Sequence, residues 1–228
     1  MAARRDGTQD KRPQRQAAPI PSAQEPPLSL ERIVATAVEL LDAEGIDGLK
    51  MRRLADRLGS GAMSLYWHVA NKDEVFDLAL DSVLEYRGSP QLSESPDWRQ
   101  AVVHMLEDWR ASMLRHPWSA SLLPRRALGP NILARLELLG GILSRAGVDE
   151  ADLNGAIWSL WNYVMGATIT RANFDLSDED MLAGQQRLAH LSQEYPTIER
   201  ARLLLDNDWD GVFRKGLDFL LDGLVPRR

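Results

Sequence analysis

Apolar side chains recur at helical spacing from residue 29 onward, a pattern that predicts an all-α protein. Ser29 is a favourable N-cap residue, and Gly45 is placed to end the helix that follows it. One face of this helix is apolar and is formed by Ile33, Ala37, Leu40 and Leu41. Nowhere do alternating β-branched residues extend far enough to indicate a strand.

Three shorter helices are predicted after the first. Residues 50–58 form the second helix and residues 62–68 the third, with the tight turn Gly59-Ser60-Gly61 between them. Asn71 caps the fourth helix, which extends to about residue 87, and Glu74 completes a capping box. Two short helices joined by a glycine turn have the arrangement of a helix-turn-helix, although the same spacing is as common in purely structural helical hairpins.

A second group of helices is predicted beyond a boundary at residues 88–95. Pro96 in the first helical position starts a helix that His116-Pro117 breaks near residue 115. Longer helices are then predicted over residues 130–145, 149–173, 177–194 and 207–224. We therefore expect three parts in the chain: a disordered, basic, proline-rich tail over residues 1–28, a helix-turn-helix domain over residues 29–88, and a helical domain over residues 95–225.

Charge and composition narrow the class of protein. The net charge is −6, yet residues 49–72 carry five basic residues and one acidic residue. A local basic window on an acidic chain is typical of a nucleic-acid contact. The absence of cysteine excludes disulfides, thiolate metal sites and cysteine nucleophiles. Since no apolar run approaches the roughly 20 residues of a membrane span, and the first 28 residues hold no secretory signal, we expect a cytoplasmic protein with no membrane partner.

The string from Met63 to Glu74, Met-Ser-Leu-Tyr-Trp-His-Val-Ala-Asn-Lys-Asp-Glu, is the most informative motif. It resembles the end of the DNA-binding domain of the TetR family of transcriptional regulators, in its tetracycline-repressor branch. The similarity extends without a gap from about residue 28 to residue 81. Downstream, Asp97-Trp98-Arg99, Arg115-His116-Pro117-Trp118 and residues 216–224 resemble the C-terminal domain of the same branch. The resemblance implies a DNA-binding regulator and favours a helix-turn-helix over a structural hairpin.

The resemblance also implies DNA contacts at seven positions. Arg52 is expected to reach base edges or phosphate, and Lys72 to bind phosphate at the N-terminus of the fourth helix. Ala62 and Met63 stand where the branch has a polar base reader followed by proline, so we expect them to contact thymine methyl groups. Hydroxyl and imidazole groups suited to phosphate oxygens are supplied by Ser64, Tyr66 and His68.

Other side chains of this segment are expected in the core. Leu65 and Val69 are predicted to be buried, and Trp67 is predicted to pack against Leu54 and Leu58 rather than to contact DNA. In the tail, the basic pairs Arg4-Arg5 and Lys11-Arg12 are compatible with an arm in the minor groove, but we favour a solubilising role for them.

The resemblance further implies a small-molecule pocket and a dimer interface within residues 95–225. Methionine beside tryptophan at helical spacing suits a flat apolar or aromatic ligand, although the same stripes occur in ordinary cores. The candidate ligand-binding residues are His104, Met105, Trp109, Met113, His116, Trp158, Trp161, Asn162 and Met165. The ligand pattern that accompanies a metal in the tetracycline-repressor branch is not recognisable, so we expect neither a metal nor a cofactor.

Two apolar helix faces are available for a homodimer. The helix over residues 151–171 and the last helix have the make-up of a four-helix bundle between subunits, and the last helix contributes Phe213, Leu217, Leu220, Leu221 and Leu224. We expect a homodimeric repressor that binds a palindromic double-stranded DNA operator and is released by a small apolar or aromatic effector. A regulator that takes no effector, or a protein partner, is the alternative. An all-α enzyme is disfavoured because no catalytic motif is present.

Overall fold

The computed structural model describes residues 27–86, 95–174, 176–201 and 208–225, and within them it contains helices and no strand. The all-α prediction is therefore confirmed. No helix in this part of the chain is long and apolar enough to cross a membrane. In chain order the elements are α1 (Leu30–Gly48), α2 (Met51–Arg57), α3 (Ala62–Leu65), α4 (Lys72–Val83), α5 (Trp98–Arg115), α6 (Pro117–Leu122), the 3-10 turn η2 (Leu123–Arg125), α7 (Pro130–Arg145), α8 (Glu150–Asn173), α9 (Asp178–His190), α10 (Pro196–Arg200) and α11 (Trp209–Leu224).

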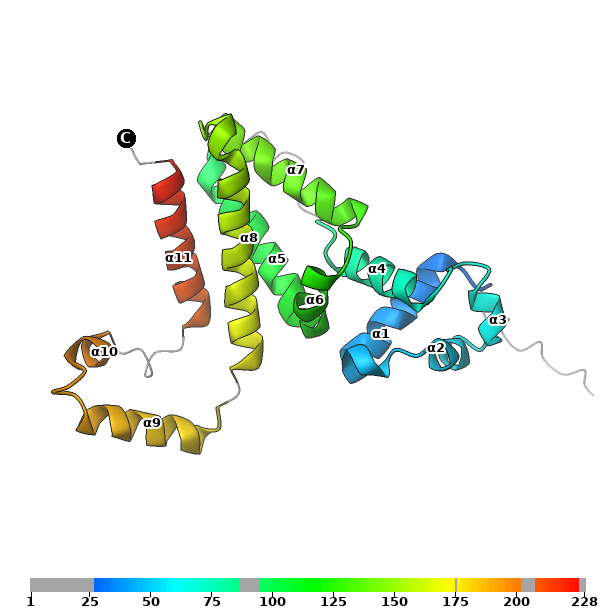
Figure 1. Cartoon of the computed structure of the whole chain (residues 1–228), viewed down its shortest axis with the longest axis horizontal. Helices are drawn as coiled ribbons and strands as arrows, with labels where there is room; N and C mark the ends of the chain where they lie inside the picture. The colour runs from blue at the N-terminus through cyan, green and yellow to red at the C-terminus, as the bar shows by residue number, and fades with distance from the viewer. Residues whose placement is uncertain (1–26, 87–94, 175, 202–207, 226–228) are drawn as a thin grey trace, which may run out of the picture.

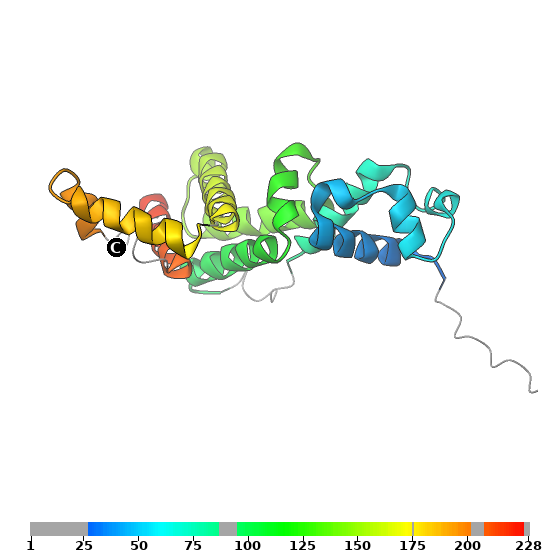
Figure 2. The ribbon, with the colours of Figure 1, turned by 90° about the horizontal axis from the view of Figure 1, so that it is seen from below.

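The helices are arranged along an elongated molecule. Helices α1 to α4 lie at one end, α9 and α10 lie at the other, and α5 to α8 lie between them with α11 beside α8 (Figure 1). The view from below gives the same order (Figure 2). The predicted tail over residues 1–28, with its basic pairs, and the predicted boundary at residues 88–95 fall almost entirely outside the described residues.

The first helix begins and bends where the sequence predicts. The Ser29 hydroxyl accepts a hydrogen bond from the backbone N–H of Arg32 at 3.3 Å, as an N-cap residue does. Gly45 has a φ of 70°, a left-handed conformation that favours glycine and interrupts α1 before its last residues. The apolar face of α1, which includes Ile33 and Ala37, is fully buried and packs against α4.

The helix-turn-helix segment is also close to its prediction. Gly59 has a φ of 64° in the turn between α2 and α3. The Asn71 side chain accepts from the backbone N–H of Glu74 at 2.9 Å, and the Glu74 carboxylate accepts from the N–H of Ala70 at 2.5 Å. This reciprocal pair fixes the start of α4. Helix α3 ends at Leu65, three residues earlier than predicted, and α4 ends at Val83 rather than near residue 87.

Two details of the C-terminal helices differ from the prediction. Helix α5 begins at Trp98 rather than at Pro96, because the Asp97 carboxylate accepts from the backbone N–H of Gln100 at 3.0 Å and caps the helix there. The polar helix expected over residues 177–194 ends at His190, and a separate short helix, α10, follows it. In α9 and α10 no side chain is buried, so no core contact extends the longer helix.

Helix α8 is the centre of the C-terminal packing and contacts α5, α6, α7 and α11. Trp109 of α5 and Trp161 of α8 meet edge to face, with ring centroids 5.0 Å apart. Helix α4 packs both against α1 and against α6 and α7, so one apolar core continues from the N-terminal helices into the C-terminal ones. The helix that completes the helix-turn-helix unit is therefore held by both halves of the molecule.

Candidate nucleic-acid interface and ligand cavities

A shared apolar core holds α2 and α3 in a fixed relation. Leu54 of α2 and Leu65 of α3 are fully buried, and Leu58 and Val69 are buried beside them. The first residues of α3 point away from this core, and Met63 is 75% exposed. A short helix presented in this way by two supporting helices is the geometry with which a helix-turn-helix enters the major groove.

The residues predicted to contact DNA lie together on α2, α3 and the start of α4, at the end of the molecule opposite α9 (Figure 1). Ser64 is half-buried, and Lys72 is half-buried with its Nζ atom 5.1 Å from the centroid of the Phe76 ring. The other five positions are exposed: Arg52, Ala62, Met63, Tyr66 and His68. The exposure of these residues is compatible with DNA contact, and their individual roles stay predictions.

The basic charge of this end is only partly neutralised. Arg53 pairs with Glu44 of α1, which ties α2 to the bent end of that helix. Arg52 and Arg57 are exposed and form no ion pair with any described residue. Two of the three arginines of α2 therefore remain available to phosphate groups.

The prediction that Trp67 packs against Leu54 and Leu58 is wrong, because this indole is 89% exposed. Helix α3 ends at Leu65, and the chain then turns, with the backbone N–H of Val69 donating to the carbonyl of Leu65 at 3.0 Å. Leu65 and Val69 occupy the inward positions of this turn and are buried as predicted. The residues between them face solvent, which adds Trp67 to the exposed surface of the unit.

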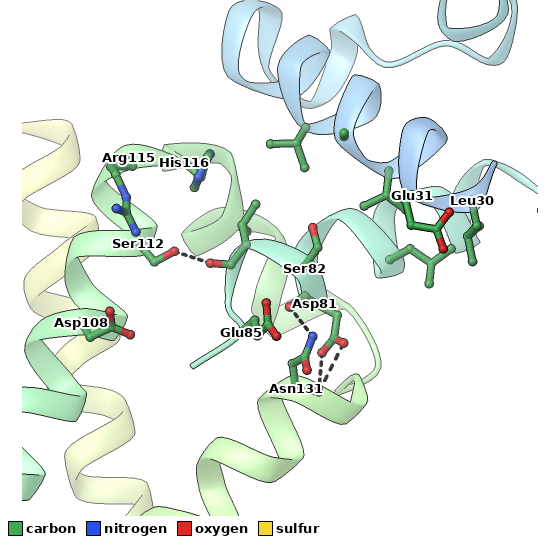
Figure 3. Close-up of a pocket in the computed structure, with 15 residues that line it drawn as sticks. Leu30, Glu31, Asp81, Ser82, Glu85, Asp108, Ser112, Arg115, His116 and Asn131 are labelled. Atoms are coloured by element: carbon green, nitrogen blue, oxygen red, sulfur yellow. Dashed lines mark hydrogen bonds between the residues drawn. The ribbon is translucent and has the colours of Figure 1, made fainter. Parts of the chain in front are cut away.

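The helix-turn-helix unit is joined to the C-terminal helices through Asp81 of α4 (Figure 3). Its carboxylate accepts hydrogen bonds from the backbone N–H groups of Asn131 at 3.0 Å and Ile132 at 3.2 Å, and so caps α7. The Asn131 amide donates in return to the Asp81 carbonyl at 3.3 Å. A Cβ atom at Gly129 would collide with the Asp81 carboxylate, so this joint requires glycine there.

Arg126, which follows η2, forms a second joint with α4. Its Nε atom donates to the Asp77 carboxylate at 2.5 Å, and its Nη atoms bond the Asp73 carboxylate at 3.0 Å and the Asp73 carbonyl at 2.7 Å. The hydrogen bond to Asp77, assisted by Asp73, raises the pKa of the Arg126 guanidinium above its ordinary value. The guanidinium thus holds the first half of α4 against the end of η2.

A third joint links α1 to α6. The Asp42 carboxylate lies 2.8 Å from Nδ1 of His116 and accepts from the indole N–H of Trp118 at 2.7 Å. His116 lies at the break between α5 and α6, so its contact with Asp42 connects that break to α1. Together the three joints fix the position of the helix-turn-helix unit against the C-terminal helices.

Comparison with known proteins decides the family. Residues 33–79 match the bacterial regulatory proteins of the tetR family, and residues 89–227 match the tetracyclin repressor-like C-terminal domain. The chain belongs to the TetR family. Members of this family are DNA-binding transcriptional regulators, so the prediction of a regulator rather than an enzyme is confirmed.

Individual relatives of this TetR-family protein cover most of its length. A protein of Saccharopolyspora erythraea described as an HTH-type transcriptional regulator is 38% identical over 207 residues, which span 90% of this chain and 87% of the relative. The transcriptional repressor DrrR1 of Streptomyces coeruleorubidus is 38% identical over 217 residues, which span 87% of this chain and 78% of the repressor. The crystal structure of the Streptomyces coelicolor TetR-family protein ActR with actinorhodin superposes with a TM-score of 0.74 at 31% identity, over 87% of this chain and 95% of that one.

Three cavities are relevant to ligand binding by a TetR-family protein. A cleft of about 870 Å³ lies between α1, α4 and α5, and its wall carries Glu85, Asp108 and His116 (Figure 3). A second cavity of about 820 Å³ lies between α7 and α8, with Trp158 and Trp161 in its wall. A third, of about 370 Å³, lies between α8 and α11.

The structure does not bring the predicted ligand-binding residues of the TetR-family domain into one pocket. Trp158 and Trp161 line the α7–α8 cavity, Asn162 lines the α8–α11 cavity, and His116 lines the cleft below α1. His104 is exposed and lines none of the three. The four remaining predicted residues pack in the core: Met105, Trp109, Met113 and Met165. A stripe at i, i+4 and i+8 marks one face of a helix, and here most of that face meets other helices.

Sequence reasoning missed the joints of this TetR-family protein. Asp42, Asp81 and Arg126 are unremarkable surface-type residues in the sequence, and their partners lie about 50 to 75 residues away. The one local signal is Gly129-Pro130, which predicted the start of α7 but not the carboxylate that caps it.

Proposed function

We propose that the protein is a ligand-responsive transcriptional repressor that binds a palindromic operator as a homodimer and is released by a small apolar or aromatic effector. The observation that carries the proposal is the exposed recognition segment, residues 62–68, in which Met63, Tyr66 and Trp67 are exposed. Beside it, Arg52 and Arg57 of α2 form no ion pair with any described residue. Soluble proteins rarely leave such a cluster uncovered unless it has a partner.

The recognition segment divides into two chemical surfaces. Ala62 and Met63, at the start of α3, offer methyl and thioether groups that suit the C5-methyl group of thymine. Around them, Arg52, Lys72 and the hydroxyl of Tyr66 suit phosphate oxygens and set the position on the duplex. The operator we expect is therefore rich in accessible thymine methyl groups at the positions that face α3.

The proposed dimer forms through α8 and α11. Phe219 and Val212 of α11 are 66% and 61% exposed, and Trp158 and Ile169 of α8 are also exposed large apolar residues. Two such helices from each subunit make a four-helix bundle that buries these side chains. A two-fold dimer presents two α3 helices to half-sites one turn of DNA apart.

The proposed effector site is the α7–α8 cavity. Two aromatic rings line its wall, and the ring centroids of Trp158 and Trp161 lie 5.6 Å apart. Behind them, the ring centroid of Trp161 lies 5.0 Å from that of the buried Trp109. A volume of about 820 Å³ accommodates a multi-ring molecule. Support comes from ActR, whose structure was solved with actinorhodin, and from DrrR1, which is named a repressor.

In the proposed mechanism, effector and operator favour different positions of α4. An effector between α7 and α8 shifts α7, and Asp81 and Arg126 transmit the shift to α4 and thus to α3. Reciprocity requires operator binding to weaken effector binding by the same factor, typically about 5- to 150-fold.

The proposal is tested by fluorescence anisotropy with labelled DNA flanking the protein's own gene, beside scrambled DNA, at two salt concentrations. We expect tight binding to one palindromic segment and weak, strongly salt-dependent binding to the scrambled DNA. A thermal-shift screen of aromatic compounds then identifies effectors, which must also release the labelled DNA. Specific DNA binding that no stabilising compound reverses would indicate a regulator that takes no small-molecule effector. The absence of binding to any DNA would contradict the proposal itself.

A further inference from the structure

Arg135 of α7 is a charged side chain inside the core, and only 1% of its surface is exposed. Its Nη2 atom donates to the Leu84 carbonyl at 3.1 Å and to the Asp108 carboxylate at 3.0 Å, and its Nη1 atom donates to the Met105 carbonyl at 3.2 Å. Burial lowers the pKa of this guanidinium, because the Asp108 carboxylate compensates only part of the lost hydration. A buried charge is costly to a fold, which makes this side chain a candidate for a role other than packing.

Arg135 and Asp81 cap each other's helices. The Asp81 carboxylate of α4 accepts from the backbone N–H groups of Asn131 and Ile132 at the N-terminus of α7 (Figure 3). About one helical turn after Asn131, Arg135 donates to the Leu84 carbonyl at the C-terminal end of α4. A carboxylate at a helix N-terminus and a guanidinium at a C-terminus both interact favourably with the helix dipoles. The position of the end of α4 therefore depends on that of the Arg135 head group.

The same guanidinium also lies against aromatic rings. Its Cζ atom is 4.9 Å from the centroid of the Tyr86 ring and 5.4 Å from that of the Trp109 ring. Trp109 meets Trp161 edge to face, and Trp161 lines the α7–α8 cavity. Trp161, Trp109 and Arg135, which we call the ring series, are all buried within the single chain, so the series does not depend on the exposed face assigned to the dimer. It connects the wall of the proposed effector cavity with the end of α4.

The ring series leaves its members some freedom to turn. The Nε atom of Arg135 and the indole N–H of Trp109 are buried, and neither donates to a described acceptor. No hydrogen bond at these atoms therefore fixes the present orientation of either group. Because the guanidinium is a rigid planar fork, a displacement of the Trp109 ring turns all of its donors together. The hydrogen bond to the Leu84 carbonyl changes with that turn, since hydrogen bonds weaken steeply with angle.

We propose that Arg135 is the positioning residue that couples the tryptophans beside the effector cavity to the C-terminal end of α4 and thereby sets operator affinity. The inference rests on the proposed function in one respect, the placement of the effector in the α7–α8 cavity. An effector that displaces the Trp161 ring displaces Trp109, turns the Arg135 fork and weakens its bond to Leu84. The polar joints of α4 transmit movements of the α7 backbone, whereas Arg135 transmits a side-chain displacement that begins on α8.

A double-mutant cycle on operator affinity tests the coupling without an effector, so its outcome does not depend on the proposed effector site. Trp161→Phe shortens the ring series at the cavity, and Arg135→Lys retains the positive charge but lacks the planar fork. The DNA is a fragment selected from a random-sequence pool by its binding to the full-length protein, and fluorescence anisotropy measures its Kd. We expect Trp161→Phe to change the Kd at least about threefold in the wild-type background and less than about 1.5-fold in the Arg135→Lys background, because coupled residues have non-additive effects.

Val164→Ala is the matched control on α8. Val164 is buried in the same core as Trp161 but is not a member of the ring series. Its effect on the Kd should agree within about 1.5-fold between the wild-type and Arg135→Lys backgrounds. If Arg135→Lys does not fold, Trp109→Phe takes its place in the cycle, because a smaller middle ring should interrupt the series in the same way.

An equal effect of Trp161→Phe in the two backgrounds would overturn the proposal, as would the lack of an effect in the wild-type background. A purely structural role of Arg135 predicts a less stable Arg135→Lys variant in which Trp161→Phe still changes the Kd. The same cycle measured as equilibrium constants of urea unfolding needs no DNA and should be non-additive by at least about threefold. The absence of binding to any sequence of the pool would contradict the proposed function, whereas additive unfolding constants would overturn the coupling itself.

Discussion

Leu65 and Trp67 are two residues apart in the recognition segment, yet they lie in opposite environments. Leu65 is fully buried and Trp67 almost fully exposed. We predict that Leu65→Ala lowers the free energy of unfolding by about 2–5 kcal/mol, because it leaves a cavity in the core of α2 and α3. Trp67→Ala should change it by less than about 0.5 kcal/mol. Urea denaturation followed by circular dichroism measures both, and a large loss in the tryptophan variant would contradict the exposed position.

Lys72 and Met63 should differ in how they affect DNA binding. Lys72→Ala removes the proposed phosphate contact, so affinity should fall by a similar factor for all sequences and the salt slope should decrease by about 1. Met63→Ala removes the proposed apolar contact with a base and should relax the preference at one base pair, with the salt slope unchanged. Anisotropy titrations at several salt concentrations separate the two effects, and Arg53→Ala, whose side chain is already paired with Glu44, serves as the control.

Burial raises the pKa of the Tyr163 hydroxyl above its ordinary value. A group whose pKa is raised in the folded state contributes stability that is complete below its unfolded pKa of about 10 and is lost as pH rises through the folded value. The unfolding free energy should therefore fall more steeply between pH 9 and pH 11 in the wild type than in Tyr163→Phe. Tyr195→Phe is the comparison variant, because it removes a tyrosine hydroxyl that is exposed.

At the scale of single residues, sequence reasoning was most successful where the controlling interaction is local. Ser29 and Asn71 cap helices as predicted because each bonds a backbone N–H three residues away. The exposure of Trp67 was missed because it depends on where α3 ends, and hydrophobicity alone places an indole in the core.

At the scale of elements, the cap that α4 supplies to α7 has a direct test. Gly129→Ala would push a methyl group into the Asp81 carboxylate, so we expect a loss of about 1–2 kcal/mol from weakened hydrogen bonds to Asn131 and Ile132. Gly184→Ala on α9 is the control, because open space surrounds that position. It should be neutral or stabilise by up to about 1 kcal/mol. Thermal unfolding monitored at 222 nm compares them.

Helix boundaries agree with the predicted ones where a capping residue or a glycine is present. They differ where tertiary packing determines the end of the helix. Helices α7 and α8 match their predicted bounds, between Gly129 and Gly147 and from Asp149 onward. The helix predicted over residues 177–194 ends at His190, because no buried face holds its last turn. Amphipathic spacing alone does not sustain a helix that packs against nothing.

At the scale of the whole molecule, the proposed dimer depends on α8 and α11. Val212→Asp and Phe219→Asp each place a charge on the exposed apolar face of α11, so we expect monomers in sedimentation velocity and a large loss of operator affinity. Leu133→Asp on α7 is the control for sedimentation only, because Leu133 is exposed and lies on neither dimer helix but lines the proposed effector cavity. A dimer that persists in both α11 variants would contradict the assignment.

The arrangement of the two halves was beyond sequence reasoning. The resemblance implied a DNA-binding domain followed by a ligand domain, and the family is confirmed. The contacts that join the halves pair residues such as Asp42 with His116 and Asp77 with Arg126, far apart in the chain and ordinary in type. Hydrophobic periodicity identifies the faces of helices, but which polar groups meet across a joint depends on the final packing.

The hydrogen bonds between Asp81 and the start of α7 provide an experimental readout of allosteric state. The amide protons of Asn131 and Ile132 are held by a carboxylate of another helix, so they exchange with deuterium only when α4 withdraws from α7. Mass spectrometry of a peptide spanning these two residues would therefore report the separation of the halves in real time. Compounds and DNA fragments can be ranked by their effect on that exchange rate before either natural ligand is identified.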